Sequence, residues 1–199
     1  MIVATDKLKQ EVLKRKDEIV KDDYHQTILN SMYHHWQKED VDMNYKEILE
    51  WFSSEYGELA KFAVLIGKYN QQVCNGGHFQ YYSNGYCDGI SGCFNEHDID
   101  IPLHKELIQL FNQTELKDEI SLKTFKILEE LYIELDDEEY IEEEIFDDGE
   151  TYYEECENPD YMEVVNTDML KRFDNEYYKK NDEFVEILEQ YFKDKIRGE

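Results

Sequence analysis

Two adjacent glycines, Gly76 and Gly77, interrupt an apolar helical pattern and limit what the chain can fold into. Upstream of them, apolar residues recur at spacings of three, four or their multiples, which places one apolar stripe on one face of a helix. The stripe comprises Phe52, Tyr56, Leu59, Ala63, Ile66 and Val73. Because glycine lacks a Cβ atom and adopts positive φ, the backbone can bend sharply at this pair. We therefore expect a long buried helix that ends in a tight turn.

Polar and aromatic side chains follow the turn directly: His78, Gln80, Tyr81, Tyr82 and Asn84. One interpretation is that the helix stops and restarts here, with His78 and Gln80 bonding the backbone groups that the break leaves without partners. The other is that the turn carries a ligand-binding or catalytic site. The first is favoured, because a buried helix break needs polar partners in any case.

Length and composition favour one helical domain. The 199 residues suit a single domain, and the 41% of apolar residues, with 16 Tyr and 10 Phe in the chain, supply a sizeable core. The chain contains two prolines, which favours helix. We predict an all-α fold, a single compact multi-helix domain over residues 1–199. Its expected parts are N-terminal helices in 1–42, a core in 48–192 and an acidic helical or loop elaboration in 134–163.

Capping residues and apolar spacing predict where the other helices begin. Thr5 or Asp6 begins a first helix that runs to about Lys21, and Asn44 begins the helix that leads into the apolar stripe. Two further helices are expected over 23–38 and 103–112. Three more are expected to begin at Ser121, at Thr167, and at Asn181 or Asp182.

The chain is strongly acidic, with 48 Asp and Glu against 21 Lys and Arg and a formal net charge of -27. Such a charge disfavours direct binding to nucleic acid or anionic lipid, since both are polyanions, so the expected partners are cationic. No apolar run reaches the length of a membrane span, and no leader pattern precedes the charged residues that follow Thr5. The sequence therefore predicts a cytoplasmic protein with free thiols.

The acidic residues concentrate between positions 134 and 163. Sixteen of these 30 residues are Asp or Glu, and no Lys or Arg occurs between Lys126 and Lys171. Tyrosines and isoleucines spaced through the segment favour a folded surface with outward carboxylates over a disordered insert. The pattern predicts a helix over 136–147, in which like charges at i,i+4 would be unfavourable for stability alone.

A helix this acidic would approach the charge density of DNA. Thirty helical residues span ~45 Å, which gives one carboxylate per ~2.8 Å against one phosphate charge per about 1.7 Å of duplex. We therefore predict that this surface binds a basic, DNA-binding protein; the alternative is a solubilising face without a partner. The expected contact residues are Asp136, Asp137, Glu138, Glu139, Glu142, Glu143, Glu144, Asp147 and Asp148.

Cysteine and histidine offer one candidate zinc site, formed by Cys87, Cys93 and His97 with His78 or His104 as a fourth ligand. Its spacing is looser than in most structural zinc sites, so the predicted site residues include no metal ligands. His34 and His35 point about 100° apart on a helix, which makes joint binding of one ion difficult.

Two motifs resemble a known family. The segment VCNGGHFQYYSN resembles the NGG-x-x-Q-Y/F-x-x-N signature of the DMP19-like family of bacterial proteins, and FDNEYY followed by a helix ending in QYF is similar to that family's closing pattern. The resemblance covers about residues 48–192. The matching residues are Asn75, Gly76, Gly77, Gln80, Tyr81 and Asn84 in the first motif and Phe173, Asp174, Tyr177 and Tyr178 in the second.

The resemblance implies an all-helical fold in which the matched residues are structural. One member of that family is a DNA mimic whose acidic surface binds a transcription factor in place of DNA, but not every member need be a mimic, and no enzyme activity carries over. The loop 85–101 and the acidic segment 134–163 depart from the family pattern, so a DNA-mimic role must depend on this chain's own charge.

Three functions remain open at this point. The first is a DNA mimic that sequesters a basic DNA-binding protein. The second is an immunity or antitoxin-like protein that blocks a basic toxin or nuclease. The third is an enzyme that uses His78, Gln80 and the nearby tyrosines, although no nucleophile–base–acid set supports it and we expect no enzyme. No cofactor is expected, and a homodimer remains open.

Overall fold

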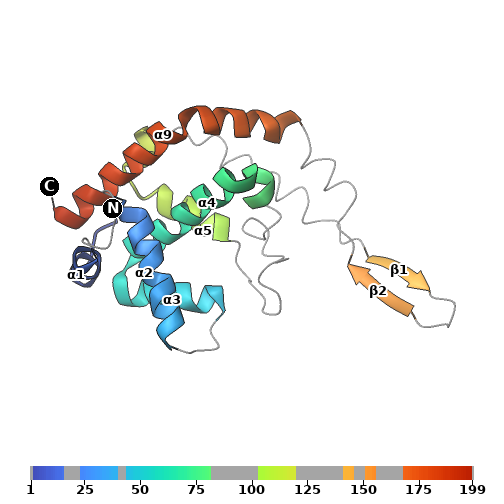
Figure 1. Cartoon of the computed structure of the whole chain (residues 1–199), viewed down its shortest axis with the longest axis horizontal. Coiled ribbons are helices and arrows are strands. Elements are labelled where there is room, and N and C mark those ends of the chain that lie inside the picture. The colour runs from blue at the N-terminus through green and yellow to red at the C-terminus, as the bar shows by residue number, and fades with distance from the viewer. Residues whose placement is uncertain are drawn as a thin grey trace.

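The computed structural model describes residues 2–15, 23–39, 44–81, 103–119, 141–145, 151–155 and 168–198 of the chain. Within these residues a helical body is accompanied by one small hairpin (Figure 1). The elements are α1 (Asp6–Lys14), α2 (Tyr24–Glu39), α3 (Tyr45–Tyr56), α4 (Glu58–Tyr81), α5 (Leu103–Phe111), α6 (Leu116–Glu119), β1 (Ile141–Ile145), β2 (Thr151–Glu155) and α9 (Asp168–Arg197). The predicted all-α class is confirmed.

Helix α4 is the centre of the body, and α2, α3, α5 and α9 all pack against it. Its sequence LAKFAVLIGKY is apolar on nearly every face, which is typical of a helix surrounded by others. Residues from Leu59 to Leu65 are buried with the exception of Lys61. Gly67 lets α2 approach closely, because a Cβ atom there would lie 3.2 Å from Cδ2 of His25. No helix in the described part combines the length and the apolar character needed to cross a membrane.

The apolar stripe is divided between two helices, where the sequence predicted one. The chain breaks at Gly57, whose φ of 93° and ψ of 175° lie in a region that is essentially restricted to glycine. A Cβ atom at Gly57 would also lie 2.8 Å from Cγ2 of Thr5. The Thr5 hydroxyl donates a hydrogen bond to the Tyr56 carbonyl at 2.8 Å. The N-cap residue of α1 therefore provides a partner for one backbone group at the break.

Both predicted N-terminal caps are confirmed. The Thr5 hydroxyl oxygen accepts from the backbone N–H of Leu8, and Asn44 forms a capping box with Glu47. Leu8 and Val12 are buried as the spacing predicts. The expected helix from Ser121 lies outside the described residues.

Helix α9 is one continuous helix, so the prediction of a second helix beginning at Asn181 or Asp182 is wrong. The buried residues Tyr177, Phe184, Leu188 and Phe192 follow one another at spacings of seven and four, without a change of phase. No Gly or Pro falls between them. Asn181 and Asp182 are typical N-cap residues, but within this unbroken apolar stripe they do not begin a new helix.

The described part of the acidic segment is an antiparallel hairpin, so the helix predicted over 136–147 is wrong for residues 141–145. Strand β1 pairs with β2 from Ile141 opposite Glu155 to Ile145 opposite Thr151. The β-branched and aromatic residues in these ten positions favour strands, and this preference prevails over the i,i+4 spacing. Figure 1 shows the hairpin apart from the helices.

Candidate functional site

The Gly76-Gly77 turn is a break inside α4, as the sequence predicted. Gly76 has φ -154° and ψ 20°, and Gly77 has φ 76° and ψ -174°. The Gly77 conformation is essentially open to glycine alone. A Cβ atom on Gly77 would also lie 2.5 Å from Oδ2 of Asp174. Gly77 is therefore required twice, by its backbone angles and by the carboxylate pressed against it.

The polar partners of this break come from α9. Oδ1 of Asp174 accepts from the backbone N–H of His78 at 2.9 Å and from its ring Nδ1 at 2.6 Å. The Tyr178 hydroxyl donates to the Val73 carbonyl at 2.8 Å. The sequence predicted that the side chains of His78 and Gln80 would bond these backbone groups, but the His78 ring bonds Asp174 and Tyr69 instead. The backbone N–H of His78 and the carbonyl of Val73 find their partners on α9, about a hundred positions further along the chain.

The imidazole of His78 is fully buried and is held from both sides. Its Nε2 lies 2.9 Å from the Tyr69 hydroxyl, opposite the bond from Nδ1 to Asp174. Burial alone would raise the pKa of the Asp174 carboxyl, but the two hydrogen bonds from His78 and its positive charge lower that pKa below its ordinary value. Asp174 is thus stabilised as a carboxylate at neutral pH.

A tyrosine, a histidine and a carboxylate in series have the connectivity that orients a catalytic base. Asp174 places a carboxylate beside His78, which an enzyme that uses His78 would need together with an open pocket. However, the imidazole has no exposed surface, so a substrate atom cannot reach it in this arrangement. The arrangement instead links α4 to α9 through a partly buried, charge-assisted hydrogen bond.

Three further residues of the matched motifs form hydrogen bonds across the break in α4 or between helices. Nε2 of Gln80 donates to Gln72 at 2.9 Å, and the Tyr81 hydroxyl lies 3.1 Å from Nδ1 of His104 on α5. From α9, the Tyr177 hydroxyl donates to Asn70. Asn75 is exposed, and Asn84 lies outside the described residues. The two motif segments, far apart in sequence, therefore meet at the helix break.

The candidate zinc loop with Cys87, Cys93 and His97 lies outside the described residues. Of the proposed fourth ligands, His78 has both ring nitrogens in contact with other residues, Nδ1 with Asp174 and Nε2 with Tyr69. Nδ1 of His104 contacts the Tyr81 hydroxyl. The adjacent pair His34 and His35 has ring centroids 6.4 Å apart, and Nε2 of His35 lies 3.0 Å from the Tyr56 hydroxyl.

Three of the predicted partner-binding residues are described, and they form the centre of β1: Glu142, Glu143 and Glu144. The others, Asp136, Asp137, Glu138, Glu139, Asp147 and Asp148, lie outside the described residues. In the strand register Glu142 is directly opposite Glu154. Like charges at directly opposite positions destabilise a strand pair.

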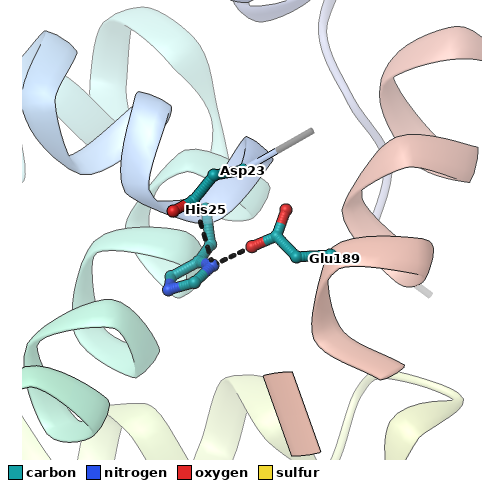
Figure 2. Close-up of side chains that lie close together, drawn as sticks. All are labelled: Asp23, His25 and Glu189. Carbon is teal, nitrogen blue, oxygen red and sulfur yellow. Dashed lines mark hydrogen bonds and ion pairs between the residues drawn. The ribbon is translucent and has the colours of Figure 1, made fainter. Parts of the chain in front are cut away.

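A second polar cluster, which the sequence did not indicate, lies where α2 begins. Asp23 and His25 approach Glu189 of α9, and Figure 2 shows the two carboxylates directed toward the same ring nitrogen, Nδ1 of His25. Because 164 positions separate His25 from Glu189, no local motif could reveal the cluster. The only signal was His25 itself, two residues after an aspartate.

Comparisons with known proteins do not add to this geometry: no family model, no curated protein and no solved structure matches the chain. The resemblance to the DMP19-like family therefore stays a prediction that depends on the motif residues.

Proposed function

We propose that the protein is an acidic binding protein that imitates the DNA backbone and sequesters a basic DNA-binding protein. The observation that carries the proposal is the concentration of carboxylates in residues 134–163, where 16 of 30 residues are acidic. No Lys or Arg occurs between Lys126 and Lys171 to neutralise them from within the segment. Such a surface attracts a cationic partner.

The hairpin supports this proposal through its register. In this register Glu142 is the partner of Glu154, so the hairpin brings two acidic positions opposite each other. The two strands carry five glutamates over five residue pairs, which span roughly 17 Å. One carboxylate per ~3.4 Å is about half the charge density of duplex DNA, which carries one phosphate per about 1.7 Å.

The family resemblance supports the same proposal. The motif residues that carry it, Gly76 and Gly77 in one segment and Asp174 and Tyr178 in the other, lie in contact at the helix break. One member of the DMP19-like family is a DNA mimic with an acidic surface, and this chain carries its own acidic segment.

The test is competition with DNA. Full-length protein is immobilised, an extract of the source organism is applied, and bound proteins are eluted either with a salt gradient or with duplex DNA. We expect a basic protein that duplex DNA displaces and that dissociates as salt rises, because salt screens contacts between exposed charges. A captured protein that neither salt nor duplex DNA releases would contradict the proposal.

A charge-matched pair of variants locates the binding surface. The triple variant Glu142→Gln, Glu143→Gln, Glu144→Gln removes three charges from β1. The control Glu50→Gln, Glu176→Gln, Glu183→Gln removes three charges from exposed positions on α3 and α9. Capture should fall at least about tenfold for the first variant and change little for the second. Equal losses would mean that net charge alone drives binding.

A further inference from the structure

Three potential ligand atoms converge between α2 and α9. They are Nδ1 of His25 and one carboxylate oxygen each from Asp23 and Glu189, and all three lie within 4.8 Å of one another. Oδ1 of Asp23 is 3.4 Å from Nδ1, and the Glu189 carboxylate contacts the same nitrogen. Figure 2 shows both carboxylates on one side of the ring. One ion could therefore contact all three residues after only small side-chain movements.

The His25 ring is held by packing, so its Nδ1 cannot turn away. His25 is buried, and its ring stacks on Phe192 with centroids 6.5 Å apart. Gly67 on α4 lies against the same ring, and a Cβ atom there would lie only 3.2 Å from Cδ2 of His25. A ligand whose orientation is fixed by its surroundings loses little entropy on binding a metal, as pre-organised sites require.

The cluster carries more negative charge than its surroundings balance. Among the described residues, Asp23 and Glu189 form ion pairs with His25 and with no Lys or Arg. Burial raises the pKa of the Glu189 carboxyl, and hydrogen bonds from His25 and from the Tyr24 backbone N–H offset part of that increase. The Glu189 carboxylate, whose side chain is 17% exposed, is costly to withdraw from water without a cation beside it.

Both carboxylates keep lone pairs for a further ligand. Oδ1 of Asp23 accepts from the backbone N–H of Gln26 at 3.1 Å, and Glu189 accepts from the N–H of Tyr24. A carboxylate has about four acceptor sites, so neither is saturated. The Asp23 side chain is 42% exposed, against 4% for His25, and so provides the route from solvent.

We propose that Asp23, His25 and Glu189 bind one divalent transition-metal ion that links the start of α2 to α9. One imidazole nitrogen with two carboxylates suits Mn²⁺, Co²⁺ or Zn²⁺, whereas Mg²⁺ and Ca²⁺ prefer sites of oxygen alone. Three protein ligands leave a coordination position for water. The residues involved are distinct from the acidic segment, so this site stands independently of the proposed function.

The test is a Co²⁺ titration of the metal-free full-length protein by calorimetry, with millimolar Mg²⁺ present to occupy loose acidic sites. We expect one Co²⁺ per chain that the variant Asp23→Asn binds more than about 100-fold more weakly, since loss of an outer-shell partner alone costs about 10- to 100-fold. Asparagine caps a helix as well as aspartate does, so this variant keeps the α2 cap. The variant Glu189→Gln should lose the same ion.

The matched control is Glu183→Gln, which removes an exposed carboxylate from the same helix α9 and should bind Co²⁺ as the wild type does. Cysteine sites are identical in all four proteins, so they cancel in the comparison. In paramagnetic NMR, bound Co²⁺ should broaden resonances at the start of α2 and around Glu189. Equal Co²⁺ affinity in the wild type, Asp23→Asn and Glu189→Gln would overturn the proposal, and so would broadening that is confined to other parts of the chain.

Discussion

At the scale of single residues, Gly77 is the position with least freedom to change. Alanine there would adopt angles of 76° and -174° that only glycine tolerates, and its Cβ atom would meet the Asp174 carboxylate at 2.5 Å. Strain of this kind costs of order 1–3 kcal/mol before any contact is lost. We expect Gly77→Ala to lower the free energy of unfolding by at least about 2 kcal/mol, measured by urea denaturation.

Gly198→Ala is the control for that substitution. Gly198 also has positive φ, 73°, but a Cβ atom there has no atom within 4 Å. It should cost roughly 1–2 kcal/mol and less than Gly77→Ala, because only the backbone preference is lost. If both variants unfold at the same urea concentration, the contact with Asp174 is not what constrains Gly77.

At the scale of elements, the carboxylate of Asp174 joins α9 to the break in α4. The pKa of Asp174 is lowered in the folded protein, so the link adds stability above the ordinary aspartate pKa of about 4. That stability is lost as pH falls through the lower, folded-state value. Asp174→Asn should therefore be less stable than the wild type at pH 7, and the difference should shrink below about pH 4.

Thermal melts of the wild type and Asp174→Asn between pH 7 and pH 2.5 measure the difference in their stability. The other acids titrate in both proteins, so their contribution cancels in this difference. Asp182→Asn, an exposed change on the same helix, should track the wild type within about 0.5 kcal/mol at every pH. A gap between Asp174→Asn and the wild type that widens in acid would contradict a lowered pKa.

Local chemistry made the starts of α1 and α3 predictable, whereas a contact distant in sequence decided where α3 ends. Thr5 and Asn44 cap helices with side chains that need only their own neighbours, and they were predicted. The break at Gly57 depends on Thr5 of α1, some fifty positions away, and was missed. The strands of the hairpin were missed because their glutamates also fit a helical spacing.

The same distinction applies to the candidate sites. Gly76 and Gly77 marked the helix break from sequence alone, because two glycines in an apolar helix have few other uses. Asp174, which fastens the break, was matched only as part of a motif. The contact between His25 and Glu189 had no sequence signal, since it exists only once α2 packs beside α9.

At the scale of the whole molecule, self-repulsion should limit stability more than any one contact. A net charge of -27 on 199 residues raises the free energy of the compact state. Salt weakens this repulsion, because the Debye length falls from about 30 Å at about 0.01 M to about 3 Å at about 1 M. We expect the melting temperature, followed by circular dichroism, to rise by several degrees across that range.

The variant Glu50→Gln, Glu176→Gln, Glu183→Gln tests the cause of that rise. It removes three exposed charges without touching the core, so it should melt above the wild type at low salt and gain less from added salt. Screening acts on both proteins, but the variant has less repulsion to screen. A wild-type melting temperature that falls with salt would instead mean that attractive pairs such as Lys61 with Glu106, 2.6 Å apart, outweigh the repulsion. In that case the excess carboxylates would already be compensated within the protein, and the main physical reason to expect a cationic partner would disappear.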